Sequence, residues 1–160
     1  MSTTKQSVDP VMVRLAATDL FSALSPAALR VVRSSVREHR VTAGSTVVRR
    51  GDPDRRLYVI VDGTTRVIRA SGASVYLRVG EHFGEIASLD GLSRSASVVA
   101  ETDLHLVSLA HFNLLALMRE HHEVALGVAR SLCVVSRREG CPARSTDEIR
   151  LPEAVHSFGC

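Results

Sequence analysis

Residues 80–100 read GEHFGEIASLDGLSRSASVVA, and this stretch decides how the rest of the chain is interpreted. It holds a glycine-bracketed turn, the acidic residue Glu85, and an arginine nine positions later, Arg94. Apolar runs typical of strands lie on both sides of it. Gly84 permits a close backbone approach, and a helical turn over Glu85–Leu89 would point free amides at an anion. The pattern therefore predicts a binding site for a small anion.

These side chains match what a cyclic nucleotide requires of a protein. The cyclic phosphate needs a fixed cation and hydrogen-bond donors, which Arg94 and Ser95 can supply. The ribose 2′-hydroxyl needs a carboxylate acceptor, a role that Glu85 can fill as acidic residues do in dinucleotide folds. The purine needs an apolar wall, for which Val75 and Leu77 are the candidates on the preceding strand.

Residues 83–98, FGEIASLDGLSRSASV, resemble the phosphate-binding cassette of the cyclic-nucleotide-binding domain family. That family includes the catabolite activator protein, the regulatory subunits of protein kinase A and the cyclic-nucleotide-gated channels. The resemblance covers about residues 20–138. The segment LFSALSPAALR is similar to the family's entry helix, AGSTVVRRGDPDRRLYVIVDGTTRVI to its first four strands, and LLALMREHHEVALGVARSL to its paired closing helices.

The resemblance implies a role for each matching position. Glu85 would bind the ribose hydroxyl, Arg94 would pair with the phosphate, and Leu132 on the last helix would close over the base. The residues predicted to contact the ligand through side chains or backbone groups are Phe83, Gly84, Glu85, Ile86, Ala87, Arg94, Ser95 and Ala96. Ser88 departs from the family pattern, which is usually apolar there. Cyclic AMP is the expected ligand because bacterial members usually use it, with cyclic GMP as the alternative.

The periodicity outside the cassette predicts an α+β fold: an antiparallel β-roll, or jelly-roll-like barrel, flanked by N-terminal helices and two C-terminal helices. Helices are predicted over 10–18, from the start signal Ser25–Pro26 through Val36, over 111–120 and over 123–138. Strands are predicted over 46–49, 57–61, 65–69, 75–79, 96–100 and 104–109. Asp62–Gly63 and Ser71–Gly72 are turn signals. Cys133 is expected to be buried by packing.

The chain is predicted to comprise a disordered N-terminus over 1–7, one cyclic-nucleotide-binding domain over 8–138 and an irregular tail over 139–160. Its 160 residues, 45% of them apolar and 23% charged, suit one core. The net charge of +3 is mild, and the short arginine pairs are expected on the surface. No signal-peptide pattern and no apolar stretch long enough for a membrane span is present, which favours the cytoplasm.

The predicted function is a regulatory sensor without catalytic activity, whose C-terminal helix changes conformation when the nucleotide binds. Its effector is unknown, and a homodimer through the apolar closing helix is an open alternative. One other interpretation is a degenerate domain that serves only protein–protein contacts. Another is a regulator of the catabolite-activator type that lacks its DNA reader. The residues after Arg138 contain Gly140, Pro142 and Pro152, so a helix-turn-helix does not fit and no direct DNA binding is predicted.

No metal site is predicted. The run His121–His122–Glu123 contains metal-ligating side chains, but adjacent residues on a helix face different ways, so they do not share an ion. His82 precedes Glu85 without the His-x-His pair that a metal-binding cupin barrel would require. The three cysteines are odd in number and show no CxxC spacing, which argues against a disulfide framework or a zinc site.

Overall fold

The computed structural model describes residues 9–138, which form five helices and two antiparallel sheets of four strands each. The elements in chain order are α1 (Pro10–Ala17), α2 (Pro26–Ser35), β1 (Val36–Val41), β2 (Thr46–Val48), β3 (Leu57–Asp62), β4 (Thr65–Arg69), β5 (Ser74–Leu77), β6 (His82–Phe83), α3 (Glu85–Asp90), β7 (Ala96–Ala100), β8 (Leu104–Leu109), α4 (His111–Glu120) and α5 (His122–Arg138). The predictions for the two termini, including the absence of a DNA reader after α5, lie outside the described residues.

The two N-terminal helices begin at caps that the sequence specifies. Asp9 accepts a hydrogen bond from the amide of Val11 at 2.9 Å, and Ser25 accepts one from the amide of Ala28 at 3.2 Å. A proline occupies the first helical position in both cases, where its missing N–H costs nothing. These caps fix where α1 and α2 start.

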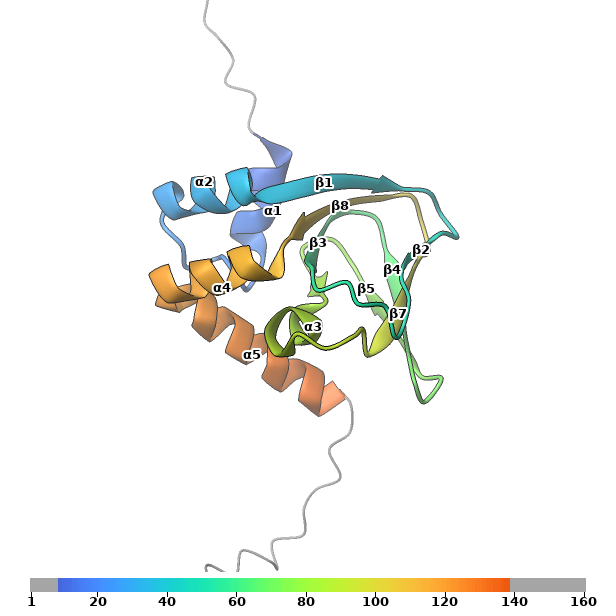
Figure 1. Ribbon diagram of the computed structural model, residues 1–160. Helices are drawn as coiled ribbons and strands as arrows, with labels where there is room; N and C mark the ends of the chain where they lie inside the picture. Colours follow the sequence, from blue (N-terminus) through green and yellow to red (C-terminus); the bar gives the residue numbers. More distant parts are fainter. Residues whose placement is uncertain (1–8, 139–160) are drawn as a thin grey trace, which may run out of the picture.

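The strands form two facing sheets with the orders β1-β8-β3-β6 and β2-β7-β4-β5, all pairs being antiparallel. Figure 1 shows this β-roll on one side of the molecule, with α1, α2 and α4 gathered on the other and α3 lying between the roll and α5. The predicted fold class is confirmed. The turn at Asp62–Gly63 is also confirmed, since Gly63 has a φ of +94° and an added Cβ would overlap Asp103 and Leu104.

The core has two parts. The helical core is the set of buried side chains from α1, α2, α4 and α5 together with one face of β3 and β8; it includes Leu15, Phe21, Val32, Leu114 and Val124. The roll core lies between the two sheets and comprises Val48, Tyr58, Ile60, Leu77, Phe83, Val98, Ala100, Leu104 and Leu106. Strand β3 is buried along Leu57–Val61 because its two faces serve the two parts.

Three sequence predictions need correction. Val36 was expected to extend α2, but it opens β1, where it pairs with Leu109. The strand predicted over 75–79 ends at Leu77, because Arg78 and Glu81 form a turn closed by a 3.0 Å backbone hydrogen bond. Cys133 is exposed, not buried.

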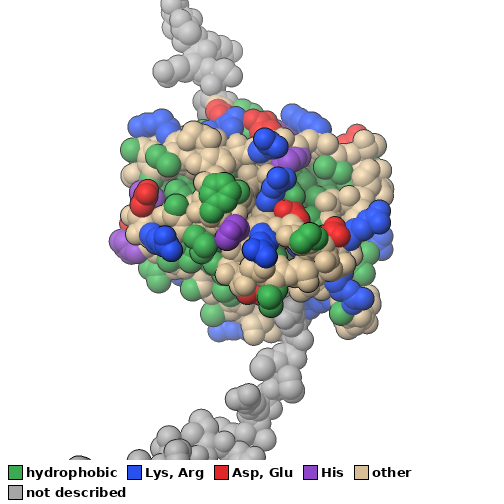
Figure 2. All heavy atoms as spheres, viewed as in Figure 1, with side chains coloured by type: hydrophobic (Ala, Val, Ile, Leu, Met, Phe, Trp, Pro, Cys, Tyr) green, Lys and Arg blue, Asp and Glu red, His purple; other side chains and the backbone are tan. Residues whose placement is uncertain are grey.

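The surface carries both signs of charge. On the face drawn in Figure 2, acidic and basic side chains are interspersed among apolar ones. The arginine pairs Arg49–Arg50 and Arg55–Arg56 are exposed, as expected. No helix within residues 9–138 is long and apolar enough to cross a membrane.

Candidate functional site

A cavity of about 970 Å³ opens between the β-roll and α5. Its walls come from β4 and β5 of the roll, from the cassette over β6, α3 and the start of β7, and from the exposed side of α5. Arg14, Asp19 and Ser22, from α1 and the segment after it, complete the rim. A volume of this size lies in the range of small-molecule sites.

Gly84 sets the geometry of the cassette. It occupies the cap position before α3 with a φ of +91°, a left-handed conformation that side chains rarely adopt. A Cβ at this position would overlap Nη1 of Arg94 and the carbonyl oxygen of Arg56. The glycine therefore allows the arginine side chain to lie directly against the backbone at the start of α3.

Glu85 is the first residue of α3, and only 5% of it is exposed although it lines the cavity. Its Oε1 accepts a hydrogen bond of 3.5 Å from the hydroxyl of Ser131 on α5. That hydroxyl also lies 2.7 Å from Nε2 of His82 on β6. A buried carboxylate with a single long hydrogen bond from a side chain can accept a further one.

Arg94 is 4% exposed and lines the same cavity. Its Nη2 donates to Oδ2 of Asp54 at 2.8 Å and to the carbonyl of Arg56 at 2.7 Å. Its Nη1 donates to the carbonyl of Gly84 at 3.4 Å, and Cζ lies 5.5 Å from the ring centre of Tyr58. The buried Nε has no hydrogen-bond partner among residues 9–138. An orphaned buried donor of this kind costs free energy unless a ligand satisfies it.

Asp54 is the counter-ion that holds the guanidinium. Partial burial raises the pKa of its carboxyl, but the hydrogen bond and charge of Arg94 and a 3.0 Å hydrogen bond from the hydroxyl of Tyr58 outweigh that effect. The pKa of Asp54 therefore lies below its ordinary 3.8, and the group is ionised at neutral pH. The same environment raises the pKa of Tyr58, mainly through burial, so the phenol keeps the proton that it donates.

The residues predicted from the sequence largely meet at this cavity. The wall residues Val75 and Leu77 line it, and so do all eight predicted contact residues: Phe83, Gly84, Glu85, Ile86, Ala87, Arg94, Ser95 and Ala96. Phe83 also belongs to the roll core, where its ring stacks on Tyr58 at 5.1 Å between centroids. Leu132, the predicted lid, packs against the helical core.

Sequence reasoning missed the part of the wall that α5 supplies: Arg130, Ser131, Val134 and Val135. The sequence predicts one apolar stripe of Val124, Val128, Leu132 and Val135 on this helix. The first three pack in the helical core, whereas Val135 lines the cavity. Ser131, Val134 and Val135 are spaced i, i+3 and i+4, so they share a neighbouring helix face. The spacing shows that these residues share a face, but it does not show that this face lines the cavity.

Ser88 has a structural role that explains its departure from the apolar pattern. It is fully buried on α3, and its hydroxyl donates to the carbonyl of Arg55 at 3.0 Å. A buried hydroxyl with a partner is stable. The serine thus ties α3 to the segment before β3 and leaves the cavity wall unchanged.

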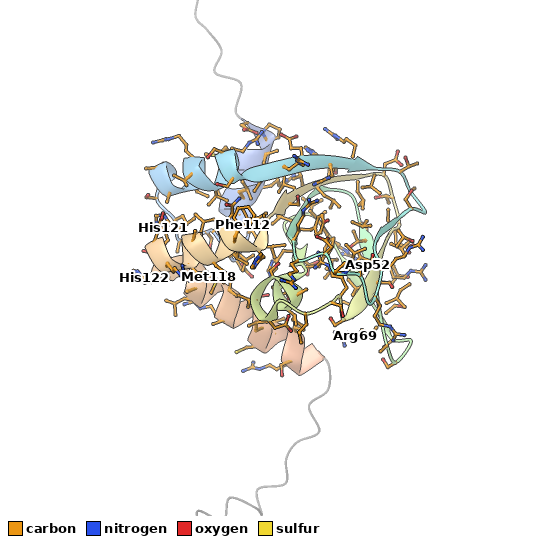
Figure 3. All side chains as sticks on the ribbon, viewed as in Figure 1. Asp52, Arg69, Phe112, Met118, His121 and His122 are labelled. Atoms are coloured by element: carbon orange, nitrogen blue, oxygen red, sulfur yellow. The ribbon has the colours of Figure 1, made fainter. Side chains whose placement is uncertain are left out.

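The structure shows where the candidate metal-ligating side chains of the described residues lie. Within residues 9–138, no group of three or more His, Cys, Asp or Glu side chains is placed to hold a metal ion. Figure 3 shows His121 and His122 at the junction of α4 and α5, across the molecule from Arg69, which lines the cavity.

The fold and the site together define a ligand-binding β-roll that presents a buried cation and a buried carboxylate to one cavity. The sequence model of the family described as "Cyclic nucleotide-binding domain" matches residues 38–121, half of the chain. The chain therefore belongs to the cyclic nucleotide-binding domain family, whose members are regulatory modules.

Individual relatives agree with this assignment. The chain is 36% identical over 111 residues to a cyclic nucleotide-gated potassium channel of Mesorhizobium japonicum, covering 69% of this chain and 31% of the channel. It is 32% identical over 92 residues to a cAMP-dependent protein kinase regulatory subunit of Aspergillus niger, covering 56% of this chain and 22% of the subunit. The chain thus spans about a third or less of the curated relatives that it matches.

Among solved structures, the Thermus thermophilus catabolite activator protein superposes with a TM-score of 0.69 at 31% identity. The match covers 76% of this chain and 60% of that protein.

Proposed function

We propose that this chain is a regulatory domain without catalytic activity, that it binds cyclic AMP in preference to cyclic GMP in the cavity between Glu85 and Arg94, and that binding changes the position of α5. One observation supports this most strongly: Glu85 and Arg94 are each about 95% buried and yet line the same cavity. Arg94 has Asp54 as its counter-ion, but buried groups of opposite charge that face one cavity without pairing with each other are typical of functional sites.

The proposed pose follows from the contacts. The phosphate lies against Arg94, the free amides at the start of α3 and the hydroxyl of Ser95, and the ribose hydroxyl donates to Glu85. The base lies along the wall of Val75 and Leu77 and is covered by α5. The nucleotide stabilises the arrangement that it binds most tightly, so α5 responds by a population shift. The signal would pass to an effector protein or domain, as the length of the curated relatives suggests.

Isothermal titration of the full chain with cyclic AMP and cyclic GMP tests the proposal. At a ligand concentration of about 100 times Kd, the nucleotide should also raise Tm by about 5–10 °C. Arg94→Leu should weaken binding by roughly 10- to 150-fold, because the variant loses the free energy of a hydrogen bond to a charged group. Arg119→Leu, at an exposed position on α4, is the matched control and should bind like the wild type.

The alternative of a degenerate domain makes the opposite prediction. Arg94 already pairs with Asp54 and the carbonyl of Arg56, and a purely structural arginine would show such contacts too. In that case the folded wild type would give no heat with either nucleotide at high micromolar concentration, and the proposal would be abandoned.

A further inference from the structure

A chain of three polar side chains joins α5 to the cassette across the cavity wall. Nε2 of His82 lies 2.7 Å from Oγ of Ser131, and that hydroxyl donates to Oε1 of Glu85 at 3.5 Å. A serine hydroxyl has one hydrogen, so when Ser131 donates to Glu85 the imidazole must be the donor to Ser131. The hydroxyl of α5 therefore lies between a ring on β6 and the carboxylate on α3.

The position of Ser131 along α5 makes this contact consequential. Val124 and Val128 are completely or almost completely buried and anchor the first half of the helix in the helical core. From 129 to 137, Ser131, Leu132 and Val135 are partly buried and the other residues are exposed. Ser131 thus makes the polar contacts that hold the cavity-lining half of α5. Leu132 makes the apolar contact of the same half with the helical core.

We propose that Ser131 couples the ribose site to α5: in the ligand-free domain its hydroxyl occupies Glu85, and a ribose 2′-hydroxyl that binds Glu85 takes its place. This inference rests on the proposed function, which assigns Glu85 to the ribose. Both donors are hydroxyls directed at the same buried carboxylate, and the displacement requires that the ribose take Oε1, the oxygen that Ser131 contacts, so that each gains where the other loses. Binding of the sugar transfers Glu85 from the helix to the ligand and frees the second half of α5 to move into the position in which it covers the base.

The ligand-free half of the proposal is tested on the full chain by hydrogen exchange, without any nucleotide. Ser131→Ala should speed amide exchange over residues 129–137 by about two- to tenfold, the effect of losing one hydrogen bond. Ser136→Ala is the matched control, because Ser136 is exposed on the same helix and the substitution changes helix propensity equally. Equal exchange in the two variants would show that Ser131 does not hold the helix.

The displacement half is tested by titration with cyclic AMP and with 2′-deoxy cyclic AMP. Ser131→Ala removes the competing hydroxyl, so it should bind cyclic AMP about two- to tenfold more tightly than Ser136→Ala does. The 2′-deoxy analogue has no hydroxyl to place on Glu85, so its affinity should be the same in both variants. Weaker binding of cyclic AMP by Ser131→Ala, or an equal gain for both nucleotides, overturns the displacement.

The experiments distinguish failure of nucleotide binding from failure of the coupling through Ser131. If wild type and variants all bind neither nucleotide, the proposed function is wrong and the displacement step falls with it. Hydrogen exchange then still decides whether Ser131 holds α5, because that measurement needs no ligand. If cyclic AMP binds but the two variants match in both experiments, the proposed function stands and the coupling through Ser131 is rejected.

Discussion

Nη2 of Arg94 lies 2.8 Å from Oδ2 of Asp54, forty residues earlier in the chain. The same carboxylate oxygen accepts the hydroxyl of Tyr58 at 3.0 Å, and the guanidinium carbon lies over the ring of Tyr58. Of the three guanidinium nitrogens, Nη2 makes the short hydrogen bonds, to Asp54 and to the carbonyl of Arg56. Nε has no partner within the described residues, and the contact of Nη1 with the carbonyl of Gly84 is long. Asp54 therefore fixes the guanidinium through Nη2 and leaves Nε able to donate to a further acceptor.

Asp54→Asn should weaken cyclic AMP binding by about tenfold, because the neutral amide no longer fixes the guanidinium by a charge-assisted hydrogen bond. Titration calorimetry gives the affinity. Glu120→Gln, an exposed carboxylate-to-amide change on α4, is the control. The combination with Arg94→Leu should cost no more affinity than Arg94→Leu alone, since Asp54 acts through that arginine. Additive losses would mean that Asp54 contacts the ligand independently.

Gly84→Ala should both destabilise the domain and weaken nucleotide binding. The new methyl group would meet Nη1 of Arg94 and the carbonyl of Arg56, in addition to the strain of a φ of +91°. Gly72→Ala isolates the strain, because Gly72 has a φ of +85° and nothing within 4 Å of an added Cβ. We expect a loss of about 1–3 kcal/mol for Gly72→Ala and a larger one for Gly84→Ala, measured by urea unfolding. Only Gly84→Ala should change the affinity.

Most of the fold could be predicted because local signals agree with it. Strands β4, β7 and β8 and helix α4 have the predicted bounds, and Ser25–Pro26 marks the start of α2. The sequence could not reveal β1, because it is an edge strand whose residues VREHRV are partly exposed and lack a clear alternation. Strand β6 has two residues, too short for any periodicity. Both strands exist because of the partners they pair with.

The cassette side of the site was predictable and the α5 side was not. The cassette is contiguous, so its spacing is visible in one short stretch of sequence. The face that α5 turns to the cavity depends on how the helix is rotated against the core, which Val124 and Val128 determine together with Leu132. Leu132 packs against the helical core, whereas Ser131, one residue earlier and about 100° around the helix, lines the cavity. Asp54 was missed for a related reason, since its link to Arg94 joins distant parts of the chain.

Gly127→Ala should destabilise the domain, although glycine-to-alanine changes inside helices ordinarily stabilise by up to about 1 kcal/mol. An added Cβ at Gly127 would lie 2.9 Å from both Cα and the carbonyl oxygen of Leu20, so α5 would have to move away from the segment after α1. Ser136→Ala, at an exposed position of the same helix, should stabilise slightly. The free energy of unfolding decides between the two signs, and a gain for Gly127→Ala would contradict the close packing described for α5.

Two histidines make the stability depend on pH. Burial lowers the pKa of His82 below its ordinary 6.5, and this outweighs the opposing effect of Glu85, Asp19 and Glu81. Burial also lowers the pKa of His39, whose Nε2 lies 2.8 Å from the hydroxyl of Ser108. Both rings therefore resist protonation in the folded domain.

The unfolded chain takes up these two protons near pH 6.5, whereas the folded domain takes them up only at lower pH. The unfolded state thus binds more protons below pH 6.5, so stability is fully present above that pH and falls as the pH drops through it. Tm measured from pH 7.5 to pH 5 should decline, and His82→Gln or His39→Gln should reduce the slope because glutamine does not titrate. His122→Gln, at a side chain that is 83% exposed, is the control. A slope unchanged in both test variants would mean that neither buried ring is responsible.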